Sequence, residues 1–186
     1  SSLYSQFDPI DPVGTSAVAL ARLRPILRAA QRCQAFVNLD MEQASFKDLT
    51  LRLFRDVLME DEFRSWSDIG IAIQAYLRDT PADLAGLAHW AERRGHPVWV
   101  RLVKGAYLEP EDVVFTRKRD VDASYARLFA TLLAREHPVD VATHDPALIE
   151  GVRTRVDAFE YGWSRVEFQM LYGVRRDLQA RLAGDG

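Results

Sequence analysis

The chain has a single cysteine, Cys33, among its 186 residues. One thiol cannot build a disulfide framework or a thiolate metal site, so we expect a reducing compartment. No apolar run approaches the roughly 18 residues of a membrane-spanning helix, and Ser1 to Tyr4 does not open a charged and then apolar leader. We therefore expect a cytoplasmic protein whose membrane contact is at most peripheral.

Motifs for several other ligands are also missing. The 24 Lys and Arg residues nearly balance the 27 Asp and Glu residues, and no long block of like charge occurs. No nucleic-acid partner is therefore predicted. No Gly-x-Gly-x-x-Gly follows a strand-like run and no Walker A lysine loop occurs, which argues against a Rossmann domain. No metal site is predicted, because no His-x-x-x-His or acidic ligand box includes any of His89, His96, His137 and His144.

The residues that are present favour one core, because 48% of them are hydrophobic. Short β-rich apolar runs alternate with longer segments of helical period, which is typical of βα units around a parallel sheet. The predicted strands span residues 35–40, 69–75, 98–104, 139–144 and 166–171.

Local signals mark several helix ends. Ser45 precedes apolar residues at helical spacing and is predicted to be an N-cap. Thr80-Pro81 and Asp145-Pro146 each predict a capping residue followed by a proline in the first turn, and Gly95 predicts a helix end.

The length of the repeat favours a barrel. Each βα unit takes about 30 residues, near one eighth of the roughly 250 residues of a (β/α)8 barrel. We therefore predict an α/β fold of the (β/α)8 TIM-barrel type, here incomplete, with about five to six βα units. Residues 1–186 are predicted to form the central portion of a single barrel domain.

Polar residues cluster at the carboxyl ends of the predicted strands. Strands covered on both faces are normally apolar, so polar residues in them need a reason. Each one alone could satisfy stray backbone groups or pair with a structural partner. Together they predict a site at the barrel mouth, where barrel active sites lie. These residues are Asp40, Gln74, Arg101, His144 and Gln169.

Five segments of the sequence resemble the proline dehydrogenase family, both its stand-alone enzymes and the dehydrogenase domain of the bifunctional proline utilisation protein. They occur in family order and span nearly the whole chain. The segments are Asn38-Leu-Asp-Met-Glu42, Ile73-Gln-Ala-Tyr-Leu-Arg78, Arg101-Leu-Val-Lys-Gly-Ala-Tyr107, Ala142-Thr-His-Asp145 and Val166-Glu-Phe-Gln-Met-Leu-Tyr-Gly173.

The resemblance implies a barrel that binds FAD and oxidises L-proline to Δ1-pyrroline-5-carboxylate by hydride transfer to the flavin. It implies a quinone as electron acceptor, with peripheral contact at the inner membrane, and an aldehyde dehydrogenase domain or partner for the product. By matching position, Asp40 and Arg101 are the implied catalytic pair, and Tyr107 borders the substrate. The implied FAD contacts are Met41, Gln74, Lys104, Gly105, Ala106, Thr116, Lys118, Thr143, His144 and Gln169.

The chemistry suits these residue types. Hydride transfer places negative charge on the flavin ring, and donors such as Arg101 and Gln74 can stabilise it. Gly105 lets the backbone approach a flat cofactor. Thr143 and His144 precede a predicted helix whose amides suit a pyrophosphate. Asp40 is interpreted as an organiser of cations rather than as a proton acceptor.

The resemblance also leaves alternatives open. The family's carboxylate-binding lysine and paired arginines match no position here, so this chain is expected to be the central part of a barrel. Arg175 and Arg176 are interpreted as solvated surface residues. One alternative function is a non-catalytic or truncated barrel segment that keeps part of the flavin site. Another is a Schiff-base barrel enzyme that uses Lys104.

Overall fold

The computed structural model describes residues 3–159 and 162–184. Strands and helices alternate along the chain, and all five predicted strands are present, each a little shorter than predicted. The strands are β1 (Val37–Leu39), β2 (Ile69–Gln74), β3 (Trp99–Val103), β4 (Val139–Ala142) and β5 (Val166–Gln169). The helices are α1 (Pro12–Cys33), α2 (Ala44–Val57), α3 (Thr80–Arg94), α4 (Lys118–Ala134), α5 (Pro146–Val156) and α6 (Arg176–Gly184), with a 3-10 turn at Trp163–Arg165.

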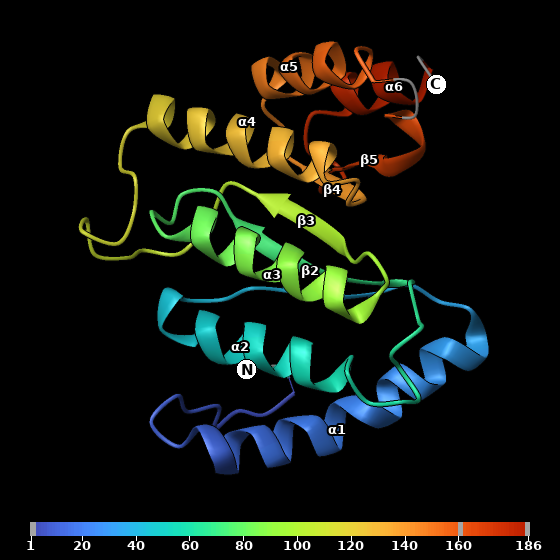
Figure 1. Cartoon of the computed structure of the whole chain (residues 1–186). Helices are drawn as coiled ribbons and strands as arrows, with labels where there is room; N and C mark the ends of the chain where they lie inside the picture. The colour runs from blue at the N-terminus through green and yellow to red at the C-terminus, as the bar shows by residue number, and fades with distance from the viewer. Residues whose placement is uncertain (1–2, 160–161, 185–186) are drawn as a thin grey trace.

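The five strands form one parallel sheet in the order β1-β2-β3-β4-β5. A doubly wound sheet reverses its strand order at a switch point, whereas a (β/α) barrel keeps the order of the chain. The helices follow one another along the outside of the sheet, from α1 to α6, as Figure 1 shows. The predicted fold is therefore confirmed as part of a (β/α) barrel.

The core lies between the sheet and these helices. Alternate strand residues such as Ile71, Val100 and Val141 are fully buried, and they belong to the same cluster as Leu87 and Phe129 of the helices. The alternation places the remaining strand residues on the inner face of the barrel. This arrangement leaves the polar residues of the strands facing inward, toward the mouth.

The inner face of the sheet is closely packed around Gly70, near the amino ends of the first three strands. A Cβ at Gly70 would lie 2.8 Å from Asn38 Oδ1 and 2.9 Å from Trp99 Cβ. The rings of Phe36 and Trp99 meet edge to face at 5.8 Å between centroids. The small residue in β2 is therefore needed for close packing between neighbouring strands.

The helix ends follow the local signals in part. Gly95 ends α3 with a φ of 83°, and Asp145 caps α5 by accepting the Ala147 amide hydrogen at 3.1 Å, as predicted. The cap of α3 is Asp79 instead of Thr80, whose hydroxyl donates to the Gln74 carbonyl at 2.6 Å.

The predicted N-cap at Ser45 is wrong, because α2 begins at Ala44 and Gln43 makes no capping bond with its side chain. Glu109 supplies the cap from the loop between β3 and α4, since its Oε1 accepts the Ala44 amide hydrogen at 2.7 Å. The same loop is attached to the segment after β2, where the Phe115 amide donates to the Tyr76 carbonyl at 2.8 Å. The loop after β3 is therefore hydrogen-bonded to the segments that follow β1 and β2.

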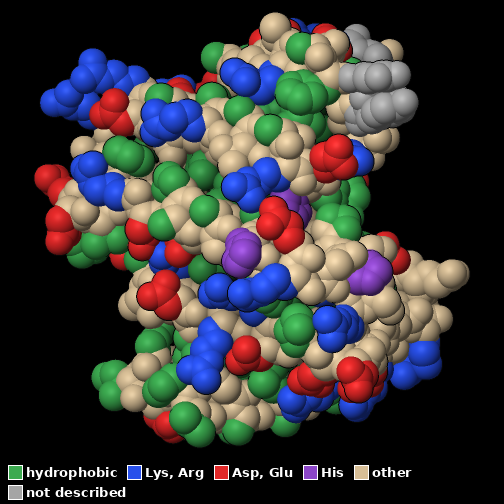
Figure 2. Space-filling model, viewed as in Figure 1, with side chains coloured by type: hydrophobic (Ala, Val, Ile, Leu, Met, Phe, Trp, Pro, Cys, Tyr) green, Lys and Arg blue, Asp and Glu red, His purple; other side chains and the backbone are tan. Residues whose placement is uncertain are grey.

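The helix-bearing surface carries intermixed acidic and basic side chains, as Figure 2 shows. This pattern agrees with the nearly balanced composition of the chain. Within residues 3–159 and 162–184, none of the helices is both long and apolar enough to cross a membrane.

Candidate functional site

Arg101 lies at the centre of a polar network at the barrel mouth. Its Nη1 donates to Asp40 Oδ1 at 2.8 Å, and its Nε donates to Gln169 Oε1 at 2.7 Å. Asn38 Nδ2 also donates to Asp40 Oδ1, at 3.0 Å. In a barrel, alternate strands contribute side chains to the same level. Arg101 of β3 can therefore reach Asp40, just after β1, across the small Ala72 of β2, its partner in register. On the other side it reaches Gln169 of β5 past β4.

The two residues predicted as a catalytic pair thus form an ion pair. The Asp40 side chain is 73% exposed and that of Arg101 is 27% exposed. In the described structure Asp40 is therefore a mouth residue open to ligands and not a buried counter-ion. The contact fits its interpretation as an organiser of cations, a role that stays a prediction.

Gln74 ends β2 and is 3% exposed. Its Nε2 donates to the Glu42 carbonyl at 3.1 Å, while its Oε1 has no hydrogen-bond partner within the described residues. A buried acceptor without a partner costs free energy unless a ligand supplies a donor. Gln74 Oε1 is therefore a candidate contact for a ligand N–H group.

A second cluster consists of two lysines and two aspartates. Lys104 Nζ lies 2.8 Å from both Asp122 Oδ1 and Asp145 Oδ2. Lys118 Nζ lies 2.6 Å from Asp145 Oδ2 and also pairs with Asp122. The hydrogen bonds from Lys104 and Lys118 lower the pKa of Asp145 well below its usual range. The cluster holds two cations at the mouth with anionic partners that another anion can replace.

This arrangement disfavours the Schiff-base alternative. A lysine that attacks a carbonyl needs a neutral amine, typically in an apolar pocket or beside another cation. Lys104 instead lies between two carboxylates.

The loop after β3 brings three more predicted residues to the mouth. Gly105 has a φ of 117°, and a Cβ there would overlap the ring of Tyr76. The glycine is therefore required by packing within the protein itself, in addition to any approach of a cofactor. Ala106 and Tyr107 follow it and are exposed, Tyr107 by 41%.

The end of β4 differs from the prediction in one respect. His144 Nε2 accepts the Leu171 amide hydrogen at 2.9 Å, and Thr143 Oγ1 accepts that of Asp145 at 3.2 Å. The amides at the start of α5 were expected to be free for a pyrophosphate, but that of Ala147 donates to Asp145 Oδ1, because the aspartate before Pro146 caps its own helix. The contact of this helix start with a pyrophosphate stays a prediction.

The last two predicted residues lie apart from this centre. Met41 is 7% exposed and belongs to the hydrophobic core cluster. Thr116 is exposed and lines a basic hollow of about 410 Å³ together with Arg78, Arg117 and Arg127. Arg175 and Arg176 are exposed, as expected for surface residues.

The sequence interpretation missed an acid beside Arg101, namely Asp140. Asp140 of β4 is 1% exposed and faces Arg101 and Glu167 in the register of the sheet. Burial, with the negative charge of Glu167, raises the pKa of Asp140 to about 6. Its signal was an aspartate in the middle of an otherwise apolar, covered strand.

Strand order and the polar mouth together define the chain as part of a (β/α) barrel with its site at the carboxyl ends of the strands. Residues 3–186 match the family model described as proline dehydrogenase, so the chain belongs to the proline dehydrogenase family.

Among curated relatives, a proline dehydrogenase from Deinococcus radiodurans is 39% identical over 169 residues, which cover 91% of this chain and 52% of that protein. Proline dehydrogenase 1 of Bacillus subtilis is 35% identical, with the same coverage of 91% and 52%. The chain therefore spans about half the length of these relatives.

Among solved structures, proline utilization A (PutA) from Bdellovibrio bacteriovorus, inactivated by N-propargylglycine, matches with a TM-score of 0.91. The two sequences are 35% identical, and the match covers 99% of this chain and 20% of the PutA chain. PutA from Corynebacterium freiburgense matches with a TM-score of 0.87 and 32% identity, over 99% of this chain and 21% of that one.

Proposed function

We propose that these residues are the flavin-binding part of an enzyme that oxidises L-proline to Δ1-pyrroline-5-carboxylate, with FAD as hydride acceptor and a quinone as the final electron acceptor. The observation that carries the proposal is the position of Arg101, a guanidinium held by Asp40 and Gln169 at the mouth of a proline dehydrogenase barrel.

The residues at the mouth fit a flavin dinucleotide in two respects. The orphaned Oε1 of Gln74 is suited to an N–H group on the edge of the flavin ring. Lys104 and Lys118 are suited to phosphate oxygens, which form charge-assisted hydrogen bonds with ammonium groups. In that case the phosphates take the place of carboxylates that now pair with both lysines.

Bound FAD supplies the hydride acceptor for oxidation of the ring carbon beside the proline nitrogen. Arg101 contributes a fixed positive charge that stabilises the negative charge developing at the mouth during that transfer. Asp40 and Gln169 hold the guanidinium in place, so that it needs little reorganisation. Tyr107, exposed at the mouth, borders the space for the substrate.

The chemistry of the product indicates a partner. A cyclic imine hydrolyses to an open-chain aldehyde, so we propose an aldehyde dehydrogenase, as a linked domain or a separate protein, as the next enzyme. A quinone acceptor dissolved in a membrane also implies peripheral contact of a cytoplasmic protein with that membrane. Relatives named bifunctional protein PutA, such as that of Rhizobium meliloti at 28% identity, are compatible with a linked domain.

The experiment is an anaerobic reduction of the purified polypeptide, as its gene encodes it, loaded with FAD. L-proline should bleach the visible absorption of the flavin, and a soluble quinone should restore it. Arg101→Met should slow the bleaching by at least about a hundredfold while flavin stays bound. A protein that retains no flavin, or whose flavin L-proline leaves oxidised, would contradict the proposal and favour a non-catalytic barrel segment.

A further inference from the structure

Asp140 is a buried acid on the inner face of the barrel that the proposed reaction does not use. Its neighbours in β4, Val139 and Val141, are fully buried and pack toward the helices, so Asp140 points inward. It is 1% exposed, and its Oδ2 has no hydrogen-bond partner within the described residues. Burial raises the pKa of this carboxyl group, whereas the charge of Arg101 and the side chain of Gln169 both lower it. A buried carboxyl group in this state is unusual and needs an explanation.

Near Asp140, carboxyl groups outnumber positively charged groups. Arg101 faces it from β3 and Glu167 faces it from β5, whereas β2 contributes only Ala72 at this level. Asp40, beyond the end of β1, pairs with the same guanidinium. The cluster therefore contains three carboxyl groups and one cation, and the most deeply buried of the three is Asp140.

The bonding of Arg101 leaves room for another partner. Its Nη1 donates to Asp40 and its Nε to Gln169, while Nη2 makes no hydrogen bond with the residues that the structure describes. Gln169 connects the two sides of the cluster, because its Nε2 donates to Glu167 Oε1 at 3.0 Å. A guanidinium has five donors in a fixed fork, so it can engage a second carboxylate.

The charge of Asp140 decides whether it needs that guanidinium. An ionised carboxylate at 1% exposure requires a cation, and Arg101 is the one opposite it in the sheet. A neutral carboxylic acid has no such requirement and leaves Arg101 to Asp40 and to a ligand. Burial and the charge of Glu167 raise the pKa of Asp140 to about 6, so the ionised and the protonated forms are both populated at slightly acidic pH.

We propose that Asp140 is a positioning residue for Arg101, which competes with Asp40 for the guanidinium when it is ionised and releases it when it is protonated. The consequence for turnover rests on the proposed function, since it assumes that Arg101 acts on a bound flavin. The competition itself does not depend on any ligand.

The competition is tested first in flavin-free protein by NMR, with labelled aspartate carboxyl and arginine guanidinium groups. The Asp140 carboxyl signal and the Arg101 signals should titrate together with one midpoint near pH 6. Asp140→Asn should remove that midpoint from the Arg101 signals. Glu167→Gln should move it to lower pH, because a neighbouring negative charge is lost.

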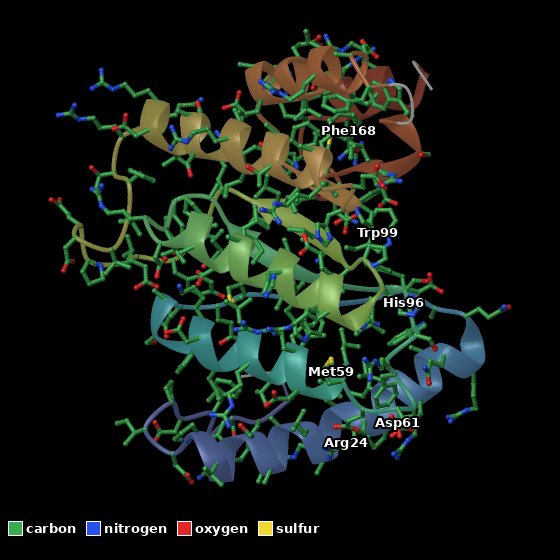
Figure 3. All side chains as sticks on the ribbon, in the orientation of Figure 1. Arg24, Met59, Asp61, His96, Trp99 and Phe168 are labelled. Carbon is green, nitrogen blue, oxygen red and sulfur yellow. The ribbon has the colours of Figure 1, made fainter. Side chains whose placement is uncertain are left out.

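A matched control is Asp61→Asn. Asp61 is exposed and lies on the α1 side of the molecule, far from Phe168 of β5, as Figure 3 shows. This variant should leave both titrations unchanged. Arg101 signals that do not respond to pH near 6, or that respond equally in Asp140→Asn, would overturn the proposal, provided that circular dichroism shows a folded variant.

The consequence for turnover is tested by the rate of flavin reduction by L-proline as a function of pH. The wild-type profile should show an inflection near pH 6, and Asp140→Asn should lose it while still binding flavin. An inflection that persists in this variant contradicts a role in the reaction. If L-proline does not reduce the flavin at any pH, the proposed function fails, whereas the NMR titrations still decide the competition.

Discussion

Glu109 caps helix α2 from the loop that follows β3, through a 2.7 Å hydrogen bond between its Oε1 and the amide of Ala44. The two residues are 65 positions apart in the sequence. The bond replaces a local cap, because the side chain of Gln43 makes none. It also fixes the loop that carries Gly105 and Tyr107 at the mouth.

Glu109→Ala should therefore lower the free energy of unfolding by about 1 kcal/mol, the usual value of a lost helix cap. Chemical denaturation measures this difference. Glu111→Ala, two residues further along the same loop, is the control, because the Glu111 side chain is exposed. Equal stabilities of the two variants would show that the cap contributes nothing.

Gly105→Ala should destabilise the protein by at least about 2 kcal/mol, because a side chain there is strained and overlaps a neighbour. The φ of Gly105 is 117°, and the overlapping neighbour is the Tyr76 ring. Gly86→Ala in α3, where a Cβ meets nothing within 4 Å, is the matched comparison. It should stabilise the protein by about 0.5–1 kcal/mol. Thermal unfolding of both variants distinguishes strain from a general effect of adding a methyl group.

The buried Asp140 should make stability depend on pH. Its pKa is raised to about 6 in the folded protein, so the folded state binds the proton more tightly than the unfolded state. The contribution of protonated Asp140 to the free energy of unfolding is fully present below about pH 4 and is lost as pH rises through the folded pKa. Asp140→Asn should therefore exceed the wild type by on the order of 2 kcal/mol at about pH 8 and by little at about pH 4.

Urea unfolding at several pH values tests this prediction. Asp61→Asn again provides the control, since Asp61 is exposed. A constant difference between wild type and Asp140→Asn across the pH range would mean that Asp140 does not change its protonation on folding.

Lys118→Met should weaken FAD binding by about tenfold, the effect of losing one charge-assisted hydrogen bond. The remaining affinity should also depend less on salt. Arg119→Met alters the next residue, whose side chain is 74% exposed and lies 3.5 Å from Asp120. Equal dissociation constants for the two variants, measured by fluorescence titration with FAD, would exclude a specific contact with Lys118.

The regular features of the fold could be predicted from the sequence because their signals are local. The strand segments are short and alternate apolar residues with the others, and Gly95 and Asp145 act on residues next to them in the chain. The cap of α2 could not be predicted in this way, because Glu109 approaches only after the sheet has formed.

The candidate site was predicted in outline. Asp40, Arg101 and Gln169 meet as their positions at strand ends suggested. The ion pairs of Lys104 and Lys118 depend on how far these side chains extend across the mouth, and the sequence alone does not determine that. Asp140 had a visible signal, a charged residue within an apolar strand, whereas its position opposite Arg101 depends on the register between β3 and β4.

Asp145 divides its two tasks between its two oxygens. Oδ1 accepts the Ala147 amide hydrogen, and Oδ2 faces both Lys104 and Lys118. An anion that draws the lysines away therefore removes partners from only one of these atoms. If the proposed anionic cofactor binds to these lysines, helix α5 is expected to keep its first turn while the ion pairs beside it are exchanged.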